Sequence, residues 1–172
     1  MQDNDELQVG SLCFRALNTP GHAEHHYVYQ FEDLCFSGDV GAVRIPAYPY
    51  LRIPMPPPEF HLEKWRASLL SLQKANFKRI APTHFGIFED VDWHLNSIHT
   101  ALDEVDIWLN KNMPGDPPLE ILRDSFLAWM ADQARREGLD PVAVEAYRLA
   151  NPLEMSVDGL LRYWKKFRVS PA

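Results

Sequence analysis

The sequence lacks the features that mark several common functional classes. No apolar run in its 172 residues approaches the roughly 20 residues that a membrane-spanning helix needs. Basic side chains are in deficit, with 17 Lys and Arg against 24 Asp and Glu, which gives a formal net charge of −7. Proteins that bind nucleic acids through a general basic surface show the opposite balance. We therefore expect neither a membrane nor a nucleic acid as a partner.

Cysteine is scarce as well. Cys13 and Cys35 are the only two, and each is flanked by Leu and Phe, which predicts two buried free thiols. The first six residues are acidic and polar, unlike the basic start of a signal peptide. Both observations favour a reduced, cytoplasmic location.

Proline, in contrast, is abundant. The chain has 14, and six of them fall within residues 46–58. Proline removes a backbone donor and fixes φ, so neither a regular helix nor an inner strand can run through this segment. It predicts a stiff loop that separates a strand-rich part from a helix-rich part.

Strand-type segments precede the loop. Residues 12–17, 27–32 and 34–36 are apolar or aromatic, and the polar turn at 31–34 predicts a hairpin. Ser37-Gly38-Asp39 is expected to end the last of these strands. A short strand at 77–81, halted by Pro82, is expected after the first helix.

Helical periodicity dominates the rest of the chain and gives an α+β fold class. Apolar side chains recur at helical spacing in five segments, with Asp92 as the expected N-cap of the second: residues 59–75, 92–112, 118–137, 141–150 and 156–167. The proline-rich break at 114–118 divides the chain into expected domains at 1–112 and 116–172, the second a small helical bundle.

Three short segments carry the chemistry. Thr19-Pro20-Gly21-His22, Ser37-Gly38-Asp39 and Pro82-Thr83-His84 each place one ligand-type side chain at a turn after an apolar strand. Strand ends of one sheet bring such side chains to one edge. Neutral imidazole and carboxylate suit zinc, iron or manganese. We therefore expect a divalent metal, with zinc preferred, bound by His22, Asp39 and His84.

At these residues the sequence resembles the metallo-β-lactamase-fold hydrolase superfamily. Thr-Pro-Gly-His is similar to its third metal motif, Ser-Gly-Asp to its fourth and Pro-Thr-His to its fifth. The resemblance implies that His22 binds a first metal, that Asp39 bridges two metals as the catalytic centre, and that His84 binds the second. It implies half of an αββα sandwich, followed by a helical C-terminal extension.

One family motif is absent. The superfamily's His-x-His-x-Asp-His motif belongs upstream of the third motif, yet none of the 21 residues before His22 is a histidine. The chain therefore resembles the C-terminal half of such an enzyme and is expected to be a fragment. Each metal would be short of ligands, so the chain alone should be inactive or weakly active. We expect it to form a homo-oligomer or to need the missing N-terminal half.

The resemblance implies a metal-dependent hydrolase, and the family's fold does not select the substrate. We expect a small-molecule ester, thioester or lactone. The alternative is a non-catalytic half-sandwich that carries a helical protein-interaction module. Three further residues are candidates for contacting substrate. His26 follows His22 by four residues, His61 follows the proline-rich loop, and Arg44 follows Asp39 by five residues and suits an anionic group.

Overall fold

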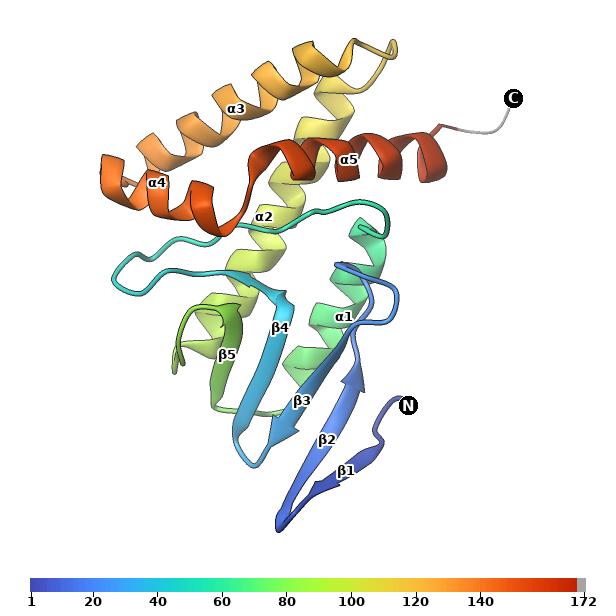
Figure 1. Cartoon of the computed structure of the whole chain (residues 1–172), viewed down its shortest axis with the longest axis vertical. Helices are drawn as coiled ribbons and strands as arrows, with labels where there is room; N and C mark the ends of the chain where they lie inside the picture. Colours follow the sequence, from blue (N-terminus) through green and yellow to red (C-terminus); the bar gives the residue numbers. More distant parts are fainter. Residues whose placement is uncertain (170–172) are drawn as a thin grey trace.

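The computed structural model describes residues 1–169. Within them, four strands are followed by a helix, a fifth strand and four further helices (Figure 1). This arrangement confirms the predicted α+β class. The strands are β1 (Glu6–Val9), β2 (Leu12–Asn18), β3 (Tyr27–Phe31), β4 (Leu34–Val43) and β5 (Arg79–His84). The helices are α1 (Leu62–Lys74), α2 (Val91–Asn112), α3 (Leu119–Arg136), α4 (Pro141–Ala150) and α5 (Leu153–Phe167).

The strands form one sheet in the order β1-β2-β3-β4-β5. The first four are antiparallel neighbours, and β5 joins β4 in parallel. It follows that β2, β4 and β5 run in the same direction. Their carboxyl ends therefore lie at one end of the sheet. His22 follows β2 and His84 ends β5, whereas Asp39 lies within β4, four residues before its end.

The two faces of the sheet differ. Helices α1 and α2 cover one face (Figure 1), and buried side chains such as Leu17, Val28 and Ile80 join them in one core. On the other face, Phe14 packs against Phe31 and Phe36 with ring centroids 5.3 and 6.2 Å apart. Phe36 remains 41% exposed, and no element within residues 1–169 covers this aromatic face.

Strands β4 and β5 differ from the prediction. Ser37-Gly38-Asp39 does not end β4, which continues to Val43 with register shifts and positive φ at Gly38 and Ala42. Strand β5 begins two residues later than expected and includes Pro82. Proline is tolerated there because β5 is an edge strand, so the missing N–H breaks no second ladder.

The helices agree with the prediction to within a few residues at each end. Helix α2 begins at Val91, so Asp90 rather than Asp92 precedes it, and α5 starts three residues early, at Leu153. None of the helices in the described part of the chain is long and apolar enough to cross a membrane.

The two cysteines lie in different surroundings. Cys35 is buried as predicted, and burial raises the pKa of its thiol to about 12. The prediction for Cys13 was wrong, because its side chain is exposed. Cys13 lies at the start of β2, where its only strand partner is the short, exposed β1, so no layer of the fold covers it.

The helical tail packs on the proline-rich loop as well as on α2. One continuous core runs from Leu17 in β2 to Tyr163 in α5 and passes through the predicted boundary near residue 114. Gly159 of α5 lies against the backbone of this loop, and a Cβ atom there would be 2.0 Å from the Met55 carbonyl oxygen. The division into domains at 1–112 and 116–172 stays a prediction.

We predict that Gly159→Ala destabilises the chain by about 1–3 kcal/mol, because the backbone at Met55 cannot yield without shifting the loop. In an unobstructed helix the same change would be stabilising, so the sign is informative. Urea denaturation measures the effect. Met155→Ala, at an exposed position of α5, is the control and should stay within about 0.5 kcal/mol. Unchanged or increased stability in Gly159→Ala would contradict the packing described.

We also predict that the aromatic face drives association of the isolated chain, because the burial of exposed aromatic side chains lowers the free energy. Sedimentation velocity over a range of concentrations should show dimers or larger species. Phe36→Ser should shift the distribution toward monomer, whereas Ile107→Ser, at an exposed position of α2, should not. A wild-type chain that stays monomeric at every concentration would refute the expectation.

Candidate metal centre

His22 lies in the turn that follows β2. Its Nδ1 is 3.1 Å from the carbonyl oxygen of Pro54 in the proline-rich loop. A carbonyl only accepts, so Nδ1 carries the proton and donates it, which leaves Nε2 with a free lone pair. That nitrogen faces Asp39, with 3.6 Å between Nε2 and Oδ2.

His84, the last residue of β5, approaches Asp39 from the other side. Its Nε2 lies 3.7 Å from Oδ1, the second carboxylate oxygen. Asp39 thus sits between two histidines, and each oxygen faces a different ring. The three side chains are 15%, 33% and 30% exposed for His22, Asp39 and His84, so the cluster is open to solvent.

The separations bear on metal binding. Both nitrogen–oxygen distances exceed hydrogen-bond length. Two ligands at 2.0–2.2 Å from a tetrahedral ion lie about 3.4 Å apart, close to the spacings of 3.6 and 3.7 Å. The donor types and their spacing therefore fit a divalent ion on either side of the carboxylate.

The number of ligands fits less well. In the described residues no group of three or more His, Cys, Asp or Glu side chains converges as a single metal site requires. An ion on the His22 side would have His22 and Asp39, and an ion on the other side would have Asp39 and His84. A catalytic zinc ordinarily has three protein ligands. Each position is therefore at least one protein ligand short.

His26 lies next to this cluster, with its ring centre 6.1 Å from that of His22. Its Nδ1 is 2.9 Å from the Thr19 hydroxyl oxygen, and its Nε2 occupies the space that a Cβ of Gly38 would enter. Burial, reinforced by the neighbouring His22, lowers the pKa of His26 to about 4. The ring is thus neutral at neutral pH. Because the imidazole lies against Gly38, position 38 has no room for a side chain.

Trp65 of α1 was not a sequence candidate, yet it positions the cluster. Its indole N–H donates to the Val40 carbonyl, one residue from Asp39, over 3.0 Å. Its ring packs edge-on to His22 at 5.9 Å, and a Cβ on Gly21 would strike its backbone. The glycine of the Pro-Gly-His turn was the available signal, since it marks a close approach by another element.

The other two candidate substrate contacts have structural partners. The His61 ring lies 4.4 Å from the Phe167 ring, and its Nδ1 is 3.1 Å from Glu63 without hydrogen-bond geometry. Burial lowers the pKa of His61. Its backbone N–H bonds the Gly21 carbonyl, which ties the start of α1 to the His22 turn. A role in contacting substrate stays a prediction for His61 and for His26.

Arg44 is buried, and its guanidinium is occupied. Two nitrogens each donate to one oxygen of Asp90 over 2.7 Å, and the group stacks on Phe88 and Trp93. This hydrogen bonding holds the pKa of Asp90 below its usual range. His94 completes the network, 3.3 Å from Arg44 and 2.7 Å from the Gly41 carbonyl. The predicted contact of Arg44 with substrate is untested; Nη1 and Nη2 already have partners, whereas its buried Nε has none among residues 1–169.

The arrangement can now be compared with solved structures. Over 93% of its length this chain aligns with an archaeal metallo-β-lactamase superfamily protein from Sulfolobus tokodaii, with a TM-score of 0.55 and 20% identity. A metallo-β-lactamase family protein from Thermus thermophilus aligns over 96% of the chain, with a TM-score of 0.58 and 20% identity. The chain has about half of the metallo-β-lactamase fold.

The likeness is partial on the side of those structures. The chain spans about half of their length, 50% and 48% respectively. No protein-family model and no curated protein matches its sequence. The predicted fold class, half of a metallo-β-lactamase-type sandwich with added helices, is confirmed, while the site residues stay predictions that the geometry above supports.

The His94 network generates a prediction about pH. His94 is fully buried, and burial lowers its pKa to about 4 from 6.5 in the unfolded chain. Between pH 6.5 and 4, His94 is protonated in the unfolded chain but neutral in the folded chain. The free energy of unfolding should therefore fall as the pH is lowered from 6.5 to 4. The loss from His94 should be about 3 kcal/mol.

The variant His94→Gln should flatten this dependence, because the amide keeps a donor and an acceptor but does not titrate. Denaturation midpoints at pH 7, 5.5 and 4.5 measure the slope, to which His26 also contributes. His99→Gln, on the same helix, serves as the control. A slope in His94→Gln equal to that of the wild type would show that His94 is not the titrating group.

Proposed function

We propose that this chain carries the divalent-metal ligands of a hydrolase that acts on an ester, thioester or lactone. The observation that supports it is the position of Asp39, with one carboxylate oxygen facing His22 and the other facing His84. Such a carboxylate suits a ligand shared by two ions. Zinc is the metal proposed, with iron and manganese as chemically compatible alternatives.

The residues of the chain have defined tasks in this proposal. Pro54 fixes the tautomer of His22, so that Nε2 presents its lone pair at the site. Trp65 fixes the backbone beside Asp39. The half-buried, neutral His26 supports the turn through its contact with the Thr19 hydroxyl. A bound divalent ion would lower the pKa of a coordinated water toward neutrality and polarise the substrate carbonyl.

The missing ligands define what the chain needs. Two side chains per ion predict weak binding, so water or a second polypeptide must complete each coordination shell. We propose that a homo-oligomer or a separate N-terminal half supplies them, and that the aromatic face of the sheet is the surface involved. The substrate is a small molecule, and the excess of acidic residues disfavours a nucleic acid.

The alternative is a non-catalytic half-sandwich with a helical interaction module. The ligand count favours it, because neither ion position has three side chains from the described residues. Metal binding separates the two hypotheses, since a non-catalytic remnant needs no ion and its histidines would merely pack in the turn.

The test is zinc stoichiometry measured by titration with a chromophoric chelator as competitor. If Asp39 is shared, the wild type should bind two ions weakly, His22→Ala and His84→Ala one each, and Asp39→Ala none. His25→Ala, an exposed neighbour of the turn, should match the wild type. Circular dichroism checks that each variant is folded. Hydrolysis of thioesters and lactones is then assayed with and without zinc.

The pattern of losses decides the outcome. No zinc bound by the folded wild type would favour the non-catalytic alternative. One ion that is lost equally in all three variants would instead indicate a single three-ligand site, which contradicts the sharing of Asp39.

A further inference from the structure

Arg44 contacts both ends of the loop that follows His84. This loop, residues 85–90, connects β5 to α2. At its start, the Arg44 backbone N–H donates to the His84 carbonyl over 2.6 Å, and the Phe85 N–H donates to the Arg44 carbonyl over 2.8 Å. At its end, the Arg44 guanidinium donates to both oxygens of Asp90. One residue therefore closes a loop that begins directly after a candidate metal ligand.

Phe88 adds a third contact within the same loop. The guanidinium carbon of Arg44 lies 3.9 Å from the centre of the Phe88 ring, which is within the range of cation–π attraction. The Phe88 backbone exchanges two hydrogen bonds of 2.9 Å with Ile80 of β5. The contact with Phe88 therefore ties Arg44 a second time to the strand that ends at His84.

Helix α2 fixes the orientation of the guanidinium. Trp93 packs on it at 4.5 Å, and the Nδ1 of His94 lies 3.3 Å from Nη1. The Nε2 of His94 is 2.7 Å from the Gly41 carbonyl oxygen, which only accepts, so Nε2 carries the proton and Nδ1 accepts from Arg44. A buried fork with two carboxylate bonds and aromatic groups against it has little freedom to turn.

The ring of His84 depends on this support. Within residues 1–169 its nitrogens form no hydrogen bond, and its neighbours are the Asp39 carboxylate, 3.7 Å from Nε2, and the Phe85 ring, 5.1 Å between centres. Phe85 is itself held by its hydrogen bond to the Arg44 carbonyl. The position of the imidazole therefore follows from its backbone, and Arg44 fixes that backbone.

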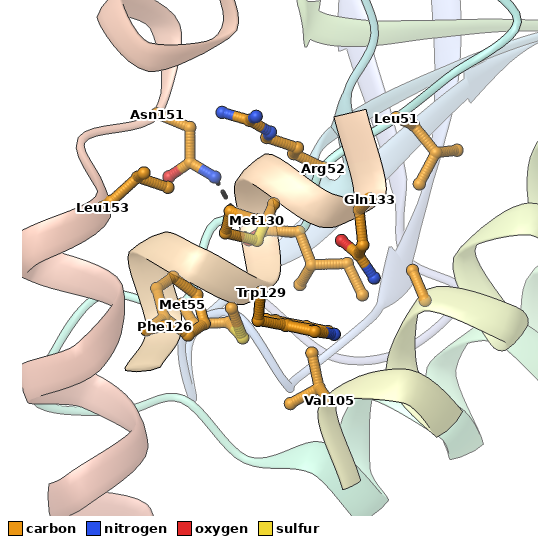
Figure 2. Close-up of a pocket in the computed structure, with 12 residues that line it drawn as sticks. Leu51, Arg52, Met55, Val105, Phe126, Trp129, Met130, Gln133, Asn151 and Leu153 are labelled. Carbon is orange, nitrogen blue, oxygen red and sulfur yellow. Dashed lines mark hydrogen bonds between the residues drawn. The ribbon is translucent and has the colours of Figure 1, made fainter. Parts of the chain in front are cut away.

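The two candidate metal-binding histidines are held by different parts of the fold. His22 bonds the Pro54 carbonyl of the proline-rich loop, which packs in turn on the helical tail. Figure 2 shows the cavity between this loop and helices α2, α3 and α5, where the Asn151 amide donates to the Ile53 carbonyl over 3.2 Å. His84 is held instead by Arg44. A change at Arg44 should thus reach one ion position and spare the other.

We propose that Arg44 is a positioning residue for His84, which holds the imidazole beside Asp39 and strengthens metal binding at the Asp39–His84 position alone. This role rests on the proposed function, because it assigns Arg44 to one of the two ion positions. An outer contact that orients a metal ligand typically contributes about 10–100-fold to metal affinity. The role uses the backbone and the paired nitrogens of Arg44, so it is separate from the predicted contact with substrate.

The experiment measures zinc affinity at each ion position separately. His22→Ala leaves the position between Asp39 and His84, and His84→Ala leaves the other. Arg44→Lys is added to each, since lysine keeps the charge beside Asp90 but cannot form two parallel hydrogen bonds. In competition with a weak chromophoric chelator, the affinity should fall at least about tenfold in the His22→Ala chain and stay within about twofold in the His84→Ala chain.

Arg79→Lys is the matched control. Arg79, the first residue of β5, pairs with Asp33 over 2.6 Å, and this pair spans 46 residues as the pair of Arg44 and Asp90 does. The variant weakens an ion pair at the opposite end of β5 from His84 and should leave both affinities unchanged. If Arg44→Lys does not fold, Phe88→Leu, which removes the ring under the guanidinium, should show the same selectivity with a smaller loss.

Hydrogen exchange in the zinc-free chain supplies a readout that does not depend on the metal. The Phe85 N–H donates to the Arg44 carbonyl, so a loosened loop should open more often and expose it. Its exchange should be faster in Arg44→Lys than in the wild type and in Arg79→Lys. Circular dichroism checks that each variant is folded.

The pattern of results separates the possible failures. An equal loss of affinity in both chains, or no loss in the His22→Ala chain, would overturn the positioning role of Arg44. Unchanged exchange at Phe85 would do the same, even with zinc bound normally. If the wild type binds no zinc, the role fails together with the proposed function, and faster exchange at Phe85 would then locate the failure in the metal hypothesis rather than in the contacts of Arg44.

Discussion

The fold depends on one constraint, the shortage of backbone donors in the proline-rich loop. Six prolines within residues 46–58 leave the loop with more carbonyl acceptors than backbone donors, and a single bridge between Arg52 and Val43 pairs it with β4. Side chains from distant elements supply the donors. His22 bonds the Pro54 carbonyl, Asn151 bonds Ile53, and Tyr147 bonds Tyr50, while Gly159 allows α5 to reach Met55.

This constraint couples the helical tail to the sheet. The donors come from the turn after β2 on one side and from α4 and the turn before α5 on the other. The carbonyl that orients His22 thus belongs to the segment on which the helices pack. The helical extension therefore acts on the candidate metal cluster through the proline-rich loop, which it contacts and whose Pro54 carbonyl accepts from His22.

The sequence was sufficient where the signal was local. His22, Asp39 and His84 were chosen because each follows or sits within an apolar strand at a turn residue, and parallel directions of β2, β4 and β5 bring them to one end. It was insufficient where partners lie far apart in the chain. Arg44 pairs with Asp90, 46 residues away, a contact that no local pattern indicates, and its contact with substrate stays a prediction. Trp65 was missed for the same reason, as its contacts with Val40 and His22 are tertiary.

The uncovered aromatic face and the incomplete coordination have a common geometrical origin. A site at the edge of a two-sheet sandwich draws ligands from both sheets, whereas the described residues form a single sheet with helices on one face. One sheet can supply His22, Asp39 and His84 from its own strands and the turn after β2, and it leaves the opposite side of each ion position open. A second layer packed on Phe14, Phe31 and Phe36 would bury the aromatic side chains and bring its own edge to Asp39. The same packing step would therefore relieve the exposed face and provide the ligands that the metal proposal requires.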